Sequence, residues 1–100
     1  MTNIPAIYQG ELKTLDQIRV SPLSRAYTFS DSIYEVIPYF SGKPLCFNEH
    51  VDRMIQSANF IGLSVNIENA IDDMKELAST LTNQDGYVYY QISRGVDMVR

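Results

Sequence analysis

Two ionisable side chains one helical turn apart, His50 and Arg53, stand in the segment Glu49-His50-Val51-Asp52-Arg53 and could carry chemistry. An arginine presents a planar fork of donors that can hold a phosphate or a carboxylate by two parallel hydrogen bonds. A histidine titrates near neutral pH and can hold or move a proton. At about 100° per residue, His50 falls on the flank of the predicted helix's apolar face and Arg53 roughly opposite that face. Arg53 is therefore expected to point away from the core of its own domain.

Each of these side chains also has a purely structural interpretation. Arg53 can pair with Glu49, one turn earlier, in a solvated ion pair that contributes on the order of a few tenths of a kcal/mol. His50 can be a hydrogen-bonded structural residue on the flank of its helix. Cys46 lies four residues before His50, but this spacing matches no nucleophile motif, and two residues cannot complete a zinc site. Cysteine catalysis is therefore the least favoured interpretation.

Two further polar side chains are candidates only in combination with others. Tyr34 lies within a predicted strand, on the face opposite Ile33 and Ile37, where most tyrosines pack the ring and hydrate the hydroxyl. Arg100 ends the sequence, and a terminal arginine is ordinarily a frayed surface residue. Taken alone, neither residue indicates a site.

Strands dominate the first half of the sequence. Alternating and β-prone residues predict a hairpin at 6–12 and strands at 18–20, 33–40 and 45–47. Gly10 supplies the turn of the hairpin, and Pro38 cannot donate to a β-ladder, so an edge or a bulge is expected close to it.

Two amphipathic helices and a last strand make up the second half. The first helix is expected to begin at Asn48, a good N-cap, and to end at Gly62. The second runs from about residue 68 to residue 82, and a β-prone run at 87–94 follows. Each helix carries one apolar stripe, formed in the first by Val51, Met54, Ile55, Ala58 and Ile61, and in the second by Ile67, Ala70, Ile71, Met74, Leu77, Ala78 and Leu81.

This order of elements predicts an α+β domain, in which an antiparallel sheet packs against two α-helices. The 100 residues fit one domain.

The net charge is −4 with scattered basic residues, which argues against a nucleic-acid surface. No apolar run reaches membrane-spanning length, and the N-terminus does not resemble a secretion signal. The single cysteine cannot form an internal disulfide, so a cytoplasmic protein is expected.

The motifs taken together resemble the N-terminal domain of the class IV (fold-type IV) aminotransferases, which use pyridoxal 5'-phosphate. The resemblance covers essentially the whole chain, and several motifs occur in the family's order and spacing. They are Ser24-Arg25-Ala26-Tyr27, Ser30-Asp31-Ser32-Ile33-Tyr34-Glu35-Val36, Glu49-His50-Val51-Asp52-Arg53, Ser57-Ala58, Ile61-Gly62-Leu63 and Tyr89-Tyr90-Gln91-Ile92-Ser93-Arg94-Gly95. The last run, followed by Arg100, is most similar to the D-amino-acid branch of the family.

The resemblance implies transfer of an amino group between an amino acid, expected to be a D-amino acid, and a 2-oxo acid, by a homodimer. It implies that Arg53 binds the cofactor phosphate and that His50 is a supporting group close to the cofactor. It also implies that Tyr34 faces the substrate and that Arg100 holds the substrate carboxylate.

The sequence departs from the family in two respects. The turn Ser30-Asp31-Ser32 stands where the family usually has Gly-Asp-Gly, and serine tolerates positive φ less well than glycine. The lysine that forms the Schiff base belongs to the family's C-terminal domain, which this chain lacks, and Lys13, Lys43 and Lys75 do not match its context. Residues 1–100 are therefore expected to be the small N-terminal domain, inactive by itself.

Three alternatives stay open at this point. An aminodeoxychorismate lyase shares the fold and the cofactor but eliminates pyruvate, and a branched-chain aminotransferase is a further member of the same family. A non-catalytic interaction module is the alternative from another class. Such a module would expose apolar surface where the second domain would dock.

Overall fold

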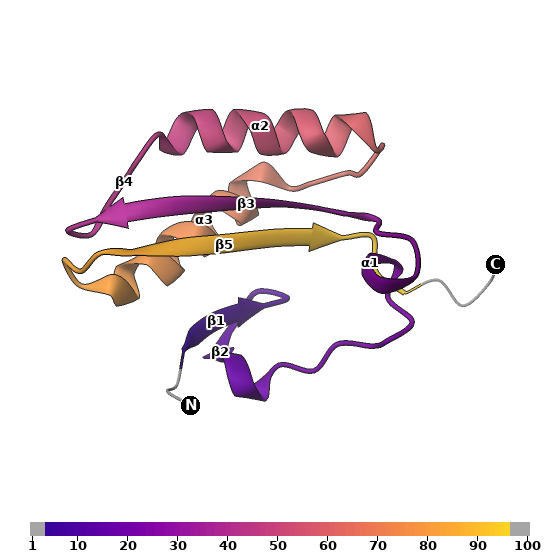
Figure 1. Ribbon diagram of the computed structural model, residues 1–100, viewed down its shortest axis with the longest axis horizontal. Helices are drawn as coiled ribbons and strands as arrows, with labels where there is room; N and C mark the ends of the chain where they lie inside the picture. Colours follow the sequence, from indigo (N-terminus) through magenta and orange to yellow (C-terminus); the bar gives the residue numbers. More distant parts are fainter. Residues whose placement is uncertain (1–3, 97–100) are drawn as a thin grey trace.

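The computed structural model describes residues 4–96, which form a sheet covered on one face by two helices, with a hairpin beside it (Figure 1). In chain order the elements are β1 (Pro5–Tyr8), β2 (Glu11–Thr14), the 3-10 turn η1 (Leu15–Gln17), α1 (Arg25–Thr28), β3 (Ser32–Phe40), β4 (Lys43–Pro44), α2 (Phe47–Phe60), α3 (Ile67–Ala78), the 3-10 turn η2 (Ser79–Leu81) and β5 (Gly86–Ser93). The predicted α+β class with an antiparallel sheet and two helices is confirmed.

β3 is the central strand of a sheet with the order β4–β3–β5. It pairs with β5 in antiparallel fashion along almost its whole length, from Ser32 opposite Ser93 to Tyr39 opposite Gly86. β4 reaches only Tyr39 and Phe40, so among residues 4–96 most of β3 has no partner strand on that side. Pro38 lies where this short pairing stops, as expected for a residue that has no N–H to donate to a ladder. Its carbonyl accepts the Leu45 N–H at 2.9 Å.

Helices α2 and α3 cover one face of the sheet, and the core lies between the two layers. Ile37 of β3, Met54 of α2 and Met74 of α3 are almost wholly buried there. Burial of a side chain of this size stabilises the fold by about 1.5–3 kcal/mol. The apolar stripes predicted for the two helices are confirmed, because their residues form or line this core. No helix within residues 4–96 is long and apolar enough to span a membrane.

Several element boundaries differ from the prediction. The second helix, predicted to run to residue 82, ends at Ala78 and is followed by the 3-10 turn η2. The strand expected at 45–47 is instead the two-residue strand β4, and Phe47 already begins α2, where its side chain packs against the core. The N-cap is Cys46 in a left-handed conformation (φ 55°), not Asn48, and its side chain makes no cap hydrogen bond. No strand forms at residues 18–20, where Arg19 instead donates to the carbonyls of Asp16 and Ile18. Local hydrogen bonds thus replace a sheet partner in that segment.

The β1–β2 hairpin forms a sheet of its own. Tyr8 pairs with Glu11 across a turn in which Gln9 (φ 51°) and Gly10 (φ 83°) both have positive φ. Positive φ at both central residues is typical of the tight turns that match the twist of a hairpin. The hairpin predicted around Gly10 is confirmed, although its second strand extends to Thr14.

Candidate functional site

A buried carboxylate, Glu35, lies at the centre of the candidate site. It stands on the helix-facing side of β3 between Ile33 and Ile37, and its side chain is only 4% exposed. Both of its oxygens accept hydrogen bonds from α2. Arg53 donates from Nε to Oε2 at 2.8 Å and from Nη2 to Oε1 at 2.7 Å, and His50 Nδ1 lies 2.8 Å from Oε1. The carboxylate therefore joins the two predicted cofactor residues into one cluster.

The charges of this cluster compensate one another. Burial by itself would raise the pKa of Glu35, but hydrogen bonds from Arg53 and His50 outweigh it and hold the pKa below the ordinary value of 4.5. The same carboxylate raises the pKa of Arg53. Glu35 is consequently ionised at neutral pH and balances the charge of the guanidinium.

The helix α2 positions the two donors. His50 and Arg53 lie three residues apart, a spacing that places side chains on neighbouring parts of a helix surface. The structural interpretation in which Arg53 pairs with Glu49 is wrong, because its guanidinium turns back to Glu35 on β3. Its side chain nevertheless stays 64% exposed, so the side of the guanidinium that faces away from Glu35 is open.

Tyr34 belongs to the other face of the sheet, as predicted, with 62% of its surface exposed. Its ring stacks on that of Tyr89 in β5, with ring centroids 5.5 Å apart and ring planes inclined by 16°. After the dominant effect of Glu35, the charge interaction with Tyr34 also raises the pKa of Arg53.

Cys46 does not form the thiolate–imidazole pair that its spacing from His50 made conceivable. It is exposed, and a hydrogen bond with Glu49 raises the pKa of its thiol, which disfavours the thiolate. Among residues 4–96, no three His, Cys, Asp or Glu side chains are grouped so that they could hold a metal ion.

A second ionic cluster holds the turn that precedes β3. Asp31 accepts hydrogen bonds on Oδ2 from Arg25 Nε at 2.9 Å and Arg94 Nε at 2.6 Å. Hydrogen bonds from Arg94 and then from Arg25 lower the pKa of Asp31. Arg94 also donates from Nη2 to the carbonyl of Ile61 at 2.6 Å, just after the end of α2. The cluster therefore ties the start of β3, the end of β5 and the end of α2 together.

Two residues mark the limits of the sequence prediction at this site. Arg100, predicted to hold the substrate carboxylate, lies outside the described residues. Glu35 was not predicted as a site residue, although strand alternation puts it on the same face as Ile33 and Ile37. An acidic residue within an otherwise apolar, core-facing pattern indicates a buried carboxylate that requires cationic partners. That was the signal available in the sequence.

The fold is similar to that of larger solved proteins. The branched-chain aminotransferase of Thermoproteus uzoniensis superposes with a TM-score of 0.73 at 20% identity, over 99% of this chain and 36% of that chain. The 4-amino-4-deoxychorismate lyase of Pseudomonas aeruginosa superposes with a TM-score of 0.74 at 16% identity, over 83% of this chain and 30% of the lyase. The fold is thus that of the small N-terminal domain of fold-type IV aminotransferases, as predicted.

Sequence similarity establishes the family. Residues 32–100 match the amino-transferase class IV family. The D-alanine aminotransferase of Staphylococcus aureus (strain MSSA476) is 37% identical over 89 residues, and that of Bacillus licheniformis 32% over 91 residues, covering 87% and 89% of this chain. The chain spans about a third of the length of these relatives, 32% in both cases. It belongs to the amino-transferase class IV family, and the family assignment made from its motifs is confirmed.

Proposed function

We propose that this chain is the cofactor-anchoring small domain of a longer aminotransferase, which transfers an amino group from a D-amino acid to a 2-oxo acid. The observation that supports the proposal most directly is the shared carboxylate of Glu35, which holds Arg53 and His50 at the exposed edge of β3. The relatives named D-alanine aminotransferase make D-alanine the first amino donor to test.

The donor set at this edge fits pyridoxal 5'-phosphate. Glu35 occupies Nε and one N–H of Nη2 of Arg53, and within residues 4–96 no partner is found for Nη1. The exposed side of the guanidinium can therefore donate to a phosphate, while the carboxylate keeps the side chain in place. When bound, the cofactor supplies an electron sink for the carbanion formed in transamination.

The residues of this domain divide the remaining tasks. Arg53 binds the phosphate group. His50 shares an oxygen of Glu35 with Arg53, and so helps to fix the orientation of that carboxylate. Tyr34, stacked on Tyr89, forms part of the substrate-facing surface, and Arg100 binds the substrate carboxylate. The lysine that carries the cofactor belongs to a second domain.

We also propose that the longer protein is a cytoplasmic homodimer. Large apolar or aromatic side chains stand exposed on the sheet face away from the helices, among them Tyr34, Phe40, Tyr87 and Tyr89. Such a face is suited to burial against another domain or subunit. The free, exposed thiol of Cys46 is compatible with a reducing compartment. Sedimentation of the purified protein and fractionation of the source cells test these two points.

The test of cofactor anchoring is the variant Arg53→Met in the protein purified at its natural length. Loss of the charged hydrogen bonds to the phosphate should weaken binding of pyridoxal 5'-phosphate by about tenfold to a hundredfold. Binding is followed by the absorbance of the added cofactor. Arg19→Met is the matched control, because Arg19 is an exposed arginine that donates only to carbonyls of its own loop. Unchanged cofactor affinity in the Arg53 variant, in a folded protein, contradicts the proposed role.

The reaction itself is tested with three substrate sets. D-alanine with 2-oxoglutarate should give pyruvate and glutamate, whereas L-leucine with 2-oxoglutarate should react more slowly. Pyruvate release from 4-amino-4-deoxychorismate alone would indicate the lyase instead. If the cofactor binds but none of the three sets reacts, the assignment as a D-amino-acid aminotransferase is wrong.

A further inference from the structure

A closed ring of backbone hydrogen bonds joins three segments at the end of the sheet where β3 begins and β5 ends, beside α1 (Figure 1). The Asp31 N–H donates to the Arg25 carbonyl at 3.0 Å, and the Arg94 N–H donates to the Asp31 carbonyl at 3.1 Å. The Arg25 N–H in turn donates to the Gly95 carbonyl at 2.7 Å. The backbone of Asp31 is thus bonded to α1 on one side and to the exit of β5 on the other.

The side chain of Asp31 reinforces this ring, which together with that side chain is called the Asp31 junction below. The carboxylate is only 13% exposed, and its Oδ2 accepts hydrogen bonds from Nε of Arg94 at 2.6 Å and Nε of Arg25 at 2.9 Å. An isolated β-bridge between Ser24 and Val96 extends the contact between the same two segments. One carboxylate therefore lies where the chain that enters β3 meets the chain that leaves β5.

The ion pairs of the Asp31 junction are suited to fixing geometry more than to supplying stability. The side chains of Arg25 and Arg94 are 26% and 36% exposed, and ion pairs that water reaches contribute little to stability. The core of the fold is built from other residues, between the sheet and the two helices. A network of this kind locks the orientation of the segments that it joins and so supports a neighbouring site.

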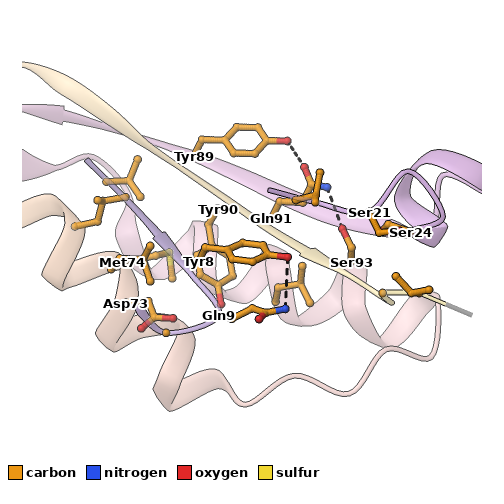
Figure 2. A pocket seen from close by; sticks show the side chains of 18 residues that line it. Tyr8, Gln9, Ser21, Ser24, Asp73, Met74, Tyr89, Tyr90, Gln91 and Ser93 are labelled. Carbon is orange, nitrogen blue, oxygen red and sulfur yellow. Dashed lines mark hydrogen bonds between the residues drawn. The ribbon is translucent and has the colours of Figure 1, made fainter. Parts of the chain in front are cut away.

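The Asp31 junction lies next to side chains that face the proposed substrate. Tyr34, the third residue of β3, stacks its ring on that of Tyr89. From there a chain of hydrogen bonds follows β5, in which the Tyr89 hydroxyl donates to Gln91 Oε1 at 2.6 Å and Gln91 Nε2 donates to Ser93 Oγ at 3.0 Å (Figure 2). Ser93 is the last residue of β5. The stacked rings and this chain of polar contacts thus end at the junction.

We propose that Asp31 is a positioning residue for substrate binding, because it fixes the exit of β5 against the start of β3. The inference rests on the proposed function, in which Tyr34 faces the substrate and Arg100, six residues after Arg94, binds the substrate carboxylate. Asp31 acts through its two arginine partners and does not itself contact the substrate. Its bonds set the direction in which the chain leaves β5.

This task is separate from that of the cluster around Glu35. Glu35 holds His50 and Arg53 of α2, whereas Asp31 bonds to arginines that flank α1 and β5. Loss of the Asp31 carboxylate should therefore weaken binding of the substrate and leave binding of the cofactor phosphate unchanged. Misplacement of a binding group by about 1 Å can lower catalytic efficiency by about a hundredfold.

The variant Asp31→Asn, in the protein purified at its natural length, tests the proposal. Asparagine keeps the shape of the side chain but removes the charge that holds two guanidinium groups. We expect kcat/KM for D-alanine to fall by about tenfold to a hundredfold, mainly through KM, with an unchanged affinity for pyridoxal 5'-phosphate. With D-alaninamide, in which a neutral amide replaces the carboxylate, kcat/KM should change by less than about threefold. Equal losses with both substrates, or an unchanged KM for D-alanine, would overturn the proposal.

A second variant and a control keep the test decisive if Asp31→Asn does not fold. Arg94→Lys keeps the positive charge, but an ammonium group cannot bond to Asp31 and to the Ile61 carbonyl as the guanidinium does. The same selective loss with D-alanine is expected, and its absence in a folded protein overturns the proposal. Glu11→Gln is the control, because it removes an exposed ion pair with Lys13 in the hairpin and should change neither substrate's kinetics.

Hydrogen–deuterium exchange distinguishes failure of this inference from failure of the proposed function. In Asp31→Asn the Arg25 N–H, which bonds to Gly95, should exchange at least about tenfold faster than in the wild type, whereas exchange at Val88 in the middle of β5 should stay the same. Unchanged exchange at Arg25 overturns the inference whether or not the protein transaminates D-alanine. Faster exchange at Arg25 in a protein whose wild type does not transaminate supports the junction and contradicts only the proposed function.

Discussion

Glu35 is an acidic side chain in a position that the strand pattern otherwise reserves for apolar residues. Its burial is tolerated because Arg53 and His50 supply three short contacts to its two oxygens. A buried charge of this kind is costly when one partner is removed, whereas exposed ion pairs contribute little. Two predictions about the stability of Glu35 variants follow from this difference.

Replacement of the buried Glu35 carboxylate by an amide tests how much this group contributes to the stability of the fold. Glu35→Gln keeps the shape of the side chain but removes the charge that balances Arg53, so we expect the free energy of unfolding to fall by about 1–3 kcal/mol. Urea denaturation at pH 7 measures the change. Glu49→Gln is the matched control on the exposed side of α2, and its effect should stay within about 0.5 kcal/mol. Equal effects of the two variants would show that Glu35 is not the structural partner of Arg53.

The free energy of unfolding should depend on pH through the titration of Glu35. The folded-state pKa of Glu35 is lowered below 4.5, so its stabilising contribution is present above that value and is lost as the pH falls through the folded pKa. The stability difference between the wild type and Glu35→Gln should therefore shrink on acidification below pH 4.5. Arg94 and Arg25 lower the pKa of Asp31. Its contribution to the acid dependence of stability should therefore be the same in the wild type and in the variant. A difference that does not change with pH would contradict this assignment.

At the scale of elements, α2 is held near both of its ends by groups from the sheet. Glu35 of β3 bonds to His50 and Arg53 in its first half. Arg94, which follows β5, donates to the Ile61 carbonyl just beyond its last turn. The helix that presents Arg53 is thus fixed relative to the sheet by hydrogen bonds as well as by the core.

The turn before β3 offers a prediction about the departure from Gly-Asp-Gly. Ser30 has a φ of 52°, in the left-handed region that glycine adopts more easily, whereas Ser32 begins β3 and is not among the positive-φ residues. We therefore expect Ser30→Gly to stabilise the fold by about 0.5–1 kcal/mol and Ser32→Gly to destabilise it by a similar amount. Urea denaturation of both variants measures the effects. If Ser30→Gly lowers the free energy of unfolding, the Ser30 side chain stabilises the fold by more than the strained backbone destabilises it.

At the scale of the whole molecule, two of the three lysines of the chain, Lys13 and Lys75, make their contacts away from Glu35. Lys13 pairs with Glu11 at 3.6 Å, and Lys75 lies 5.9 Å from the centre of the Phe47 ring, so neither belongs to the cluster around Glu35. The anchoring groups and the group that carries the cofactor are therefore expected on different domains.

The isolated 100 residues should accordingly show no transamination. With D-alanine, 2-oxoglutarate and pyridoxal 5'-phosphate, pyruvate formation should not exceed that of the cofactor without protein. The longer protein serves as the positive control. Turnover by the 100-residue chain above this background would contradict the two-domain proposal.

The local pattern of the sequence was enough to predict the layers of the fold. Period-2 alternation in β3 and the apolar stripes of α2 and α3 follow from which side chains must leave water, so the strand, the helices and their buried faces were predicted correctly. The N-cap of α2 was predicted two residues late, at Asn48 instead of Cys46. The N-cap preference of Asn48 was outweighed there by burial of the Phe47 ring against the core. The motif Glu49-His50-Val51-Asp52-Arg53 marked His50 and Arg53 as candidates, and the fold brings both side chains to Glu35.

The sequence by itself therefore determined the fold class and the family, because these depend on periodicity and motif spacing along the chain. The roles of His50, Arg53 and Tyr34 stay predictions. Only the tertiary structure decided that Arg53 bonds to Glu35 and not to Glu49, since that choice depends on a strand and a helix meeting across 18 residues of sequence. The ring of hydrogen bonds around Asp31 was likewise not evident from the sequence. It arises where α1, β3 and the exit of β5 meet, which local propensities do not specify.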